Sequence, residues 1–244
     1  MKTLVIIPSR LSASRLPGKP LLKINGLSII SHVYKKAKEA DIGEVFVATE
    51  DQEIAEDVRR NGGEAILTSN NHNSGTDRIY EALVKLGRTD AELVMNLQGD
   101  EPLMNVEDIQ NLNSNMIKTK RDLGTLAAKI NDKKTFENQN IVKVITEENL
   151  DHSKFPRALN FIRKLDKNVN DVYHHLGIYC YNVEILKKFP QEKASFKKAL
   201  TMVLNEEGSH SRSEDDVTES KVGTKLTAVM SRKVIILLMT MLIM

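Results

Sequence analysis

Two short polar segments carry residue types that could bind a polyphosphate. In the first, residues 8–19, Arg10, Arg15 and Lys19 flank Pro17-Gly18. An arginine can bind two phosphate oxygens at once, and a lysine adds a compact positive charge. The glycine lets the backbone approach a ligand, and the proline stiffens the turn. A triphosphate is one interpretation; the other is an ordinary solvated loop, because most charge clusters are only solvated.

The second segment is the acidic turn Gln98-Gly99-Asp100-Glu101-Pro102. Magnesium usually takes one or two carboxylates and completes its shell with water and substrate oxygens. A carboxylate opposite a basic loop therefore suits Mg²⁺ that bridges phosphates. The alternative is a plain turn or helix cap, for which Gly-Asp-Glu-Pro is well suited. Neither glycine-rich fingerprint of the common phosphate loops occurs in the chain, so Walker and dinucleotide-binding sites are excluded.

The elements that must position these segments alternate between strand and helix. Short apolar runs predict buried strands at residues 4–7, 45–48, 65–67 and 93–97. Helical spacing of apolar residues predicts helices at residues 28–37, 54–58 and 76–86. This rhythm predicts an α/β fold with a mostly parallel central sheet flanked by helices. Ligands bind beyond the carboxyl ends of such strands, and both polar segments follow one, so we expect them to form one site.

The pattern becomes looser after residue 105. We predict a helix at 109–116 and strands at 125–130, 142–145 and 172–181. The sequence contains neither an internal repeat nor a low-complexity linker. We therefore predict one domain over residues 1–189, in which residues 120–185 form a small sheet extension on the substrate side.

Composition narrows the class of protein. The formal net charge of the 244-residue chain is +2, too small to argue for nucleic acid, and we expect no nucleic-acid partner. The single cysteine, Cys180, cannot form an internal disulfide, which fits a reducing cytoplasm. Pro8 and Arg10 end the first apolar run too early for a secretory signal. Spanning a bilayer takes roughly 18–20 apolar residues in a row, and no stretch of this sequence reaches that length. We therefore expect a cytoplasmic protein without stable membrane insertion.

Several segments together resemble one family. They are Ile6-Ile7-Pro8-Ser9-Arg10, Ser14 to Leu21, His72 to Arg78, Asn96 to Pro102, Asn140 to Val144 and His174 to Tyr179. The combination is similar to the signature of the 3-deoxy-manno-octulosonate cytidylyltransferases, and it extends from residue 3 to about residue 189. Arg-Leu-Pro-Gly-Lys alone also occurs in sialic acid cytidylyltransferases, but its combination with Ser-Gly-Thr-Asp-Arg and His-Leu-Gly-Ile-Tyr is specific to this branch.

The resemblance implies a nucleotide-diphospho-sugar transferase fold, a homodimer and a Mg²⁺-dependent reaction. CMP would pass from CTP to the anomeric hydroxyl of 3-deoxy-D-manno-octulosonate (Kdo), with release of pyrophosphate, for lipopolysaccharide biosynthesis. Two alternatives remain. One is a cytidylyltransferase for another acidic sugar, of the sialic acid or amino-Kdo type. The other is a catalytically impaired homologue that still binds CTP.

The resemblance also implies roles for individual residues. Those that would act on the triphosphate and the metal are Arg10, Arg15, Lys19 and Asp100, with Asp100 as the Mg²⁺ ligand. Those that would line the cytidine site are Pro8, Ser9, Ser74, Gly75 and Arg78. Gln98 would face the nucleotide or the sugar, and Arg157, His175 and Tyr179 would face the acidic sugar. Without the resemblance, His175 could instead be a hydrogen-bonded structural histidine, and Tyr179 could be part of the packing of its strand.

The sequence departs from the family after about Phe189. The family continues with a helix containing Glu-x-Leu-Glu-Gln-Leu-Arg and a Gly-Val-Asp-Thr turn whose aspartate is a second Mg²⁺ ligand, and neither motif occurs in this chain. Residues 205–232 are rich in Ser, Glu, Lys and Thr, which predicts disorder. Residues 234–244 form an apolar tail without a predicted partner. Residues 190–244 are thus an atypical segment, and a shifted reading frame and a natural divergent terminus are the two explanations.

Overall fold

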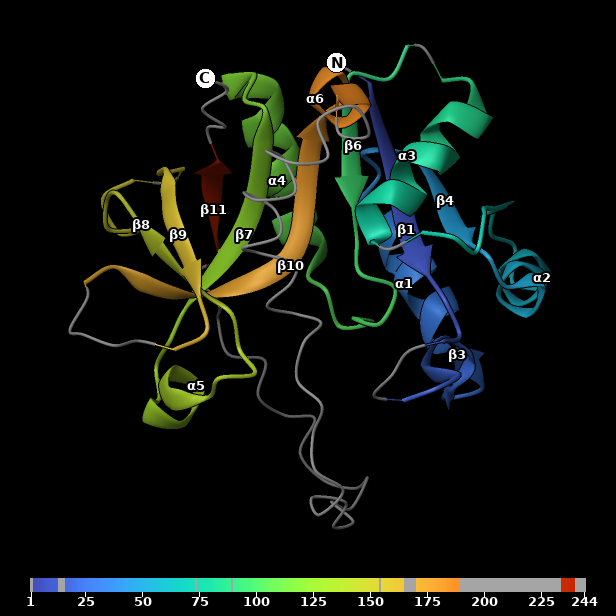
Figure 1. The fold of residues 1–244 in the computed structure, drawn as a ribbon, viewed down its shortest axis with the longest axis horizontal. Helices are drawn as coiled ribbons and strands as arrows, with labels where there is room; N and C mark the ends of the chain where they lie inside the picture. Colours follow the sequence, from blue (N-terminus) through green and yellow to red (C-terminus); the bar gives the residue numbers. More distant parts are fainter. Residues whose placement is uncertain are drawn as a thin grey trace.

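A computed structural model describes residues 2–12, 16–72, 74–88, 90–153, 155–164, 170–188 and 234–239. Within these ranges, a sheet of nine strands forms the centre of the molecule, with helices on both of its faces (Figure 1). The strand order along its main path is β11-β7-β10-β6-β1-β4-β5. The predicted α/β architecture is confirmed.

The parallel part of the sheet carries both polar segments. Its strands are β1 (Thr3–Ser9), β4 (Gly43–Thr49), β5 (Ala65–Leu67) and β6 (Leu93–Asn96). β1 lies between β4 and β6 and runs parallel to both, and β4 pairs in parallel with β5. All four strands were predicted from their apolar runs, and their carboxyl ends lie at one edge.

Both faces of β1 are buried, which explains its unbroken apolar run. Leu4 and Ile6 pack into one core cluster, whereas Val5 and Ile7 pack into the other. The helices on the Val5 side are α1 (Ile29–Glu39), α2 (Gln52–Arg60) and α4 (Val106–Thr119). Those on the Leu4 side are α3 (Gly75–Leu86) and α6 (Val183–Lys188).

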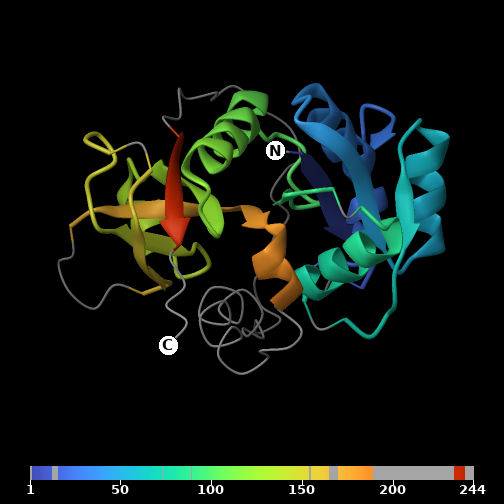
Figure 2. The same cartoon turned by 90° about the horizontal axis from the view of Figure 1, so that it is seen from above.

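The remaining strands of the sheet are antiparallel, and all of them except β11 lie within residues 120–185, where a sheet extension was predicted. They are β7 (Leu123–Lys129), β8 (Lys143–Thr146), β9 (Ala158–Ile162), β10 (Val172–Asn182) and β11 (Val234–Met239). β10 pairs with β6, β7 and β8, so this one long strand joins the extension to the parallel part (Figure 2). Its position brings residues 175–178 toward the end of β6.

Several short elements were not predicted. They are the 3₁₀ helix η1 (Lys19–Leu21), the hairpin of β2 (Lys23–Ile24) and β3 (Leu27–Ser28), and α5 (Lys133–Glu137). β9 and α6 were also missed. Most of β9 is exposed or half-buried, so its sequence lacks the apolar alternation of a core strand.

The sequence by itself named no partner for the apolar tail, residues 234–244, and the structure supplies one for Val234–Met239. These residues form β11, which pairs antiparallel with β7, Val234 opposite Ala128 and Met239 opposite Leu123. The open edge of β7 offers backbone groups that need hydrogen-bond partners, and a β-prone segment supplies them. Among the described residues, no helix combines the length and the apolar character needed to cross a membrane.

Candidate active site

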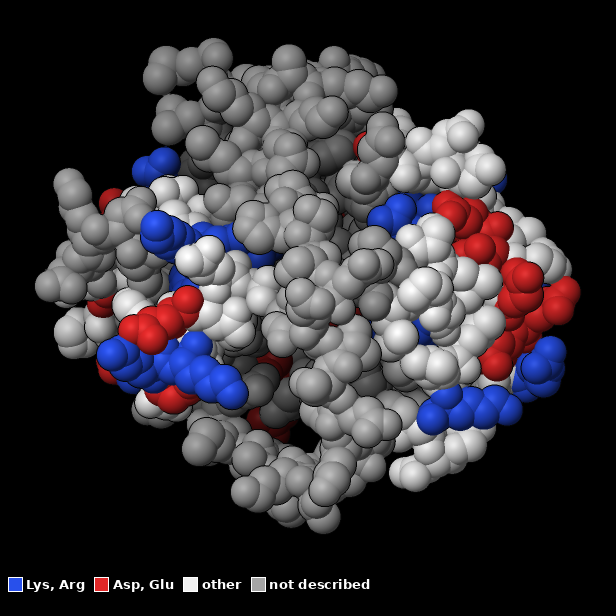
Figure 3. All heavy atoms as spheres, turned by 60° about the horizontal axis from the view of Figure 1, so that its bottom comes forward, with Lys and Arg blue, Asp and Glu red and all other residues white. Residues whose placement is uncertain are grey.

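The two polar segments meet at the carboxyl edge of the parallel strands. The ammonium of Lys19 lies 2.7 Å from Oδ2 of Asp100, although 81 residues separate them. Lys19 begins η1 after Gly18, whose φ of 73° is in the left-handed region that favours glycine. Figure 3 turns this edge of the sheet toward the reader, with acidic and basic side chains next to one another on its two flanks. The basic loop and the acidic turn therefore face one another, as the strand order predicted.

Four of the predicted cytidine residues also come together here. A methyl group added to Gly75 would lie 3.5 Å from Cγ of Pro8, so the start of α3 contacts the end of β1. Ser74 caps α3, because its hydroxyl accepts a hydrogen bond of 3.2 Å from the Asp77 amide. Ser9 is buried, and its hydroxyl has no hydrogen-bond partner among the described residues.

Arg78 lies behind this surface and is fully engaged by other groups. Its guanidinium donates to Thr68 Oγ1 at 2.5 Å and to the Ser69 carbonyl at 3.3 Å, and it forms a buried ion pair with Glu50. These partners explain how a charged side chain can be buried. Through these contacts Arg78 holds α3 against the end of β4. Its contact with cytidine stays a prediction.

The other predicted arginines differ in their surroundings. Arg10 is exposed and Arg157 is half-buried, and neither guanidinium has a hydrogen bond or an ion pair within the described ranges. Within the described residues, no acidic side chain therefore competes with an anionic ligand for either guanidinium. Arg15 lies outside the described residues.

Gln98 connects the nucleotide side to β10. A methyl group on Gly177 would lie 3.2 Å from Cγ of Gln98, so the glycine makes room for this side chain. The pairing of β10 with β7 shifts register between Leu176 and Tyr179, and this irregularity places Gly177 beside the acidic turn. The predicted sugar side therefore adjoins the predicted nucleotide side.

His175 and Tyr179 are packed inside the core, where they are only 5% and 1% exposed. The Thr125 hydroxyl donates to the Ile178 carbonyl at 2.7 Å and lies 3.0 Å from Nε2 of His175. Because that hydroxyl has a single hydrogen, Nε2 must be the donor of the second contact. Burial lowers the pKa of His175 to about 3, with a further contribution from His174, so the ring is neutral. This arrangement matches the structural reading of His175; its contact with the sugar stays a prediction.

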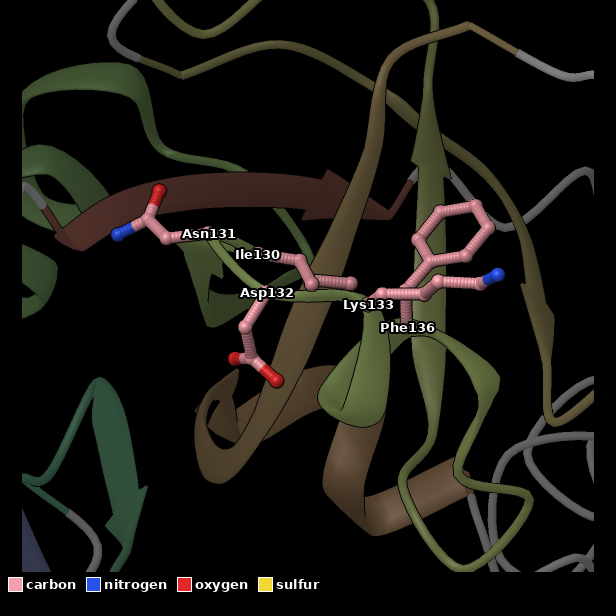
Figure 4. A pocket seen from close by; sticks show the side chains of 5 residues that line it. All are labelled: Ile130, Asn131, Asp132, Lys133 and Phe136. Carbon is pink, nitrogen blue, oxygen red and sulfur yellow. The ribbon is translucent and has the colours of Figure 1, made fainter.

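A separate hollow lies at the start of α5. It is lined by Ile130, Asn131, Asp132, Lys133 and Phe136, none of which is a predicted site residue (Figure 4). The Asp132 carboxylate accepts a hydrogen bond of 2.7 Å from the Thr135 amide and so caps α5. The Asp132 carboxylate in this hollow thus has a structural partner.

Comparison with known proteins assigns the chain to a family. The model of the cytidylyltransferase family matches residues 4–218. The 3-deoxy-manno-octulosonate cytidylyltransferase of Thermodesulfovibrio yellowstonii is 45% identical over 201 residues, which cover 78% of each chain. The enzyme of the same name from Afipia carboxidovorans is 44% identical, over 77% of this chain and 76% of the relative. The chain belongs to the 3-deoxy-manno-octulosonate cytidylyltransferase family.

A solved structure agrees with this assignment of the family. It is a CMP:2-keto-3-deoxy-manno-octonic acid synthetase complexed with CTP, and it is 33% identical to this cytidylyltransferase. The two structures superpose with a TM-score of 0.72 over 84% of this chain and 85% of the other. The predicted resemblance of residues 3–189 is thereby confirmed, together with the fold that it implied.

Among the described residues, the predicted Mg²⁺ site consists of the single carboxylate of Asp100. The described residues contain no group of three or more His, Cys, Asp or Glu side chains that could enclose a metal. Asp100 is a single, half-exposed carboxylate next to a lysine. Such a donor suits an ion that takes most of its ligands from water and phosphate oxygens. In the family that the sequence resembles, the second Mg²⁺ ligand follows the end of the resemblance at about residue 189, and residues 189–233 of this chain lie outside the described residues.

Sequence reasoning missed two acidic residues at this edge of the cytidylyltransferase. Glu50 binds Arg78, and Oδ2 of Asp51 accepts a hydrogen bond of 2.7 Å from the Leu11 amide. Both residues directly follow β4, whereas Asp100 lies four residues beyond the end of β6. Their place just after the carboxyl end of a parallel strand is the signal that could have found them.

Glu81 holds the segment that leads into α3. Its carboxylate accepts hydrogen bonds from the Ser69 amide at 2.9 and 3.1 Å and from His72, and it pairs with Lys85 at 2.7 Å. Burial alone would raise the pKa of Glu81, but the hydrogen bonds of Lys85, Ser69 and His72 outweigh it and lower the pKa to about 2.

Glu81→Gln should therefore destabilise the protein in a pH-dependent way. An acid with a lowered pKa stabilises the fold above its unfolded pKa, and that stabilisation disappears as the pH falls through the folded pKa. We expect a loss of roughly 1–3 kcal/mol near pH 7 that shrinks between pH 4.5 and pH 2. Urea unfolding at several pH values measures it.

Glu56→Gln is the matched control for this measurement. Glu56 is exposed, and the hydrogen bond from Gln52 at 3.0 Å is its only contact within the described ranges. If both variants lost the same free energy of unfolding with the same pH profile, the network around Glu81 would not hold this segment.

Proposed function

We propose that this chain transfers CMP from CTP to the anomeric hydroxyl of Kdo and releases pyrophosphate. The observation that carries the proposal is the pairing of Lys19 with Asp100 at the edge where Pro8 meets Gly75. This edge combines a cation, a possible metal ligand and a surface for a nucleoside. The relatives named 3-deoxy-manno-octulosonate cytidylyltransferase support the reaction, and the neighbour complexed with CTP supports the nucleotide.

In the proposed reaction, the protein acts mainly by position and charge. The sugar hydroxyl attacks the α-phosphorus of CTP, and pyrophosphate leaves in line. Lys19, Arg10 and Arg15 hold the triphosphate and neutralise the charge on the leaving pyrophosphate. A magnesium ion on Asp100, when bound, would supply further charge neutralisation and would acidify the attacking hydroxyl.

Lys19 changes partner when the nucleotide binds. In the free protein its ammonium contacts Asp100, and both side chains are partly exposed, 34% and 50%. Such an ion pair contributes only about 0–1 kcal/mol, so a triphosphate with several negative charges can displace it. The same step frees the Asp100 carboxylate. The ion pair therefore keeps both groups at the site while costing little to break.

The acidic sugar would bind on the β10 side. Arg157 has a guanidinium without a partner among the described residues, and it suits the sugar carboxylate. Gln98 lies between this side and the nucleotide. A sialic acid or an amino-Kdo carries the same carboxylate, so another acidic sugar remains the second candidate. We also propose dependence on Mg²⁺, a homodimer and a cytoplasmic location.

A pyrophosphate-release assay with CTP, Mg²⁺ and Kdo tests the proposed function. Turnover with Kdo supports it, and turnover only with a sialic acid or an amino-Kdo replaces the substrate. Binding of CTP without turnover of any of these sugars would identify the impaired homologue. Omitting Mg²⁺ or replacing it by EDTA tests the metal in the same assay.

Gly75→Ala should weaken CTP binding without destabilising the protein. The added methyl group meets nothing closer than Cγ of Pro8 at 3.5 Å, an ordinary contact distance. Alanine is also favoured over glycine in a helix, by about 0.5–1 kcal/mol. If cytidine packs on this surface, the methyl group takes its space, and we expect about a tenfold higher Kd for CTP.

Isothermal titration with CTP measures the nucleotide affinity of Gly75→Ala, and thermal unfolding measures its stability. Val84→Ala is a suitable control, because Val84 lies on α3 but is 60% exposed. Unchanged CTP affinity of Gly75→Ala would remove Gly75 from the proposed cytidine site.

A further inference from the structure

Asp51 occupies an unusual position at the end of β4. It is the N-cap residue of α2, but its side chain makes no hydrogen bond to that helix. The other described α-helices with an assigned N-cap, α1, α3, α4 and α5, all use the side chain of that residue as a cap. An aspartate at the N-cap normally accepts such a bond and stabilises the helix. Asp51 is therefore directed to another partner.

That partner is the basic loop. Oδ2 of Asp51 accepts a hydrogen bond of 2.7 Å from the amide of Leu11, which is 40 residues away in the chain. The amide of Asp51 donates to Oγ1 of Thr49 at 3.1 Å and holds the turn in place. The carboxylate thus bridges the loop after β4 to the loop after β1.

Leu11 in turn closes the loop that carries the cations. Its carbonyl accepts a hydrogen bond of 3.0 Å from the amide of Gly18. Both backbone groups of Leu11 are therefore engaged, one by Asp51 and one by the residue before Lys19. Arg10 precedes this anchor directly, and Lys19 follows its far end. The Asp51 carboxylate thus accepts the hydrogen bond that holds Leu11, between Arg10 and the end of the loop at Gly18 and Lys19.

We propose that Asp51 is a positioning residue, which sets Arg10 and Lys19 for the triphosphate through an oxygen acceptor and does not touch the nucleotide itself. The proposal rests on the proposed CTP site. What matters at this position is the acceptor, because a negative charge beside a triphosphate would by itself oppose binding. Asparagine retains an acceptor oxygen and lacks the charge, whereas alanine lacks both.

The test compares three variants in steady-state kinetics and CTP titration. Asp51→Ala should raise the KM for CTP about ten- to a hundredfold, the range expected when a hydrogen bond to a charged group is lost, and change kcat less than the KM. Asp51→Asn should keep the KM within about threefold of wild type, which is the rescue expected of an acceptor. Glu53→Ala is the matched control and should leave KM and kcat unchanged. Glu53 is an exposed acid in the first turn of the same helix, without a contact in the described part of the chain.

Amide hydrogen exchange of residues 10–12 reports on the anchor without any substrate. Exchange should be faster in Asp51→Ala than in wild type and unchanged in Glu53→Ala. Equal KM values for Asp51→Ala and Glu53→Ala, or exchange that is the same in both, would overturn the proposal. So would an Asp51→Asn variant as impaired as Asp51→Ala, because the charge would then be the essential feature. If wild type itself failed to bind CTP, the proposed function would fail, whereas the exchange experiment would still decide whether Asp51 anchors the loop.

Discussion

Asp100→Asn is expected to lower CTP turnover at least about a hundredfold while leaving the fold intact. The amide is a much poorer ligand than the carboxylate for a hard cation such as Mg²⁺, and electrostatic groups at a reacting phosphate are typically worth about a hundredfold or more in rate. The side chain is 50% exposed, and its contact within the described ranges is the ion pair with Lys19. We therefore expect the free energy of unfolding to change by less than about 1 kcal/mol.

Asp90→Asn is the matched control for this experiment. Asp90 is 52% exposed and pairs with Lys2 at 2.6 Å, so both variants remove one carboxylate from a surface ion pair with lysine. Pyrophosphate release at several Mg²⁺ concentrations should separate them, with normal turnover for Asp90→Asn. An Asp100→Asn variant with wild-type turnover would show that Asp100 is not the metal ligand.

Gly99→Ala is expected to damage both stability and catalysis. The added methyl group would lie 2.9 Å from the Pro8 carbonyl, 3.2 Å from Cδ1 of Ile30 and 3.3 Å from Cβ of Ser9. The backbone of β1 is held in the sheet on both sides and cannot easily move, so the acidic turn must shift instead. Such overpacking typically costs about 1–3 kcal/mol. A displacement of about 1 Å at a catalytic group can reduce the rate about a hundredfold.

Urea unfolding and pyrophosphate release measure these two effects in one preparation. Gly75→Ala serves as the control for stability, because its methyl group has room beside Pro8. If Gly99→Ala kept wild-type turnover, the placement of Asp100 would not depend on the close packing of the turn against β1.

Together, Asp100→Asn and Gly99→Ala test the identity of the metal ligand and its position separately. Asp100→Asn removes a ligand and leaves the backbone in place, whereas Gly99→Ala keeps the ligand and moves it. Loss of activity in both, with loss of stability only in Gly99→Ala, is the pattern that the proposed site requires. Raised Mg²⁺ should not restore either variant to wild-type turnover.

The amino-acid sequence alone determined the parallel part of the fold and the edge at which the site lies. Apolar runs such as residues 4–7 indicate strands buried on both faces, because a strand exposes alternate residues to opposite sides. The alternation with helices predicts parallel pairing, and parallel strands end at one edge. The sequence therefore predicts that residues 8–19 and 98–102 are neighbours, and the contact of Lys19 with Asp100 confirms it.

Only the tertiary structure decided what individual polar side chains do. Glu50 engages Arg78 and Thr125 engages His175 inside the molecule, and the substrate contacts of Arg78 and His175 stay predictions. The backbone of Val234–Met239 likewise found a partner in β7, more than a hundred residues away in the chain. Residue types and spacing report which faces are buried. The identity of a partner depends on which distant segments the sheet brings side by side, and that is a property of the whole packed chain.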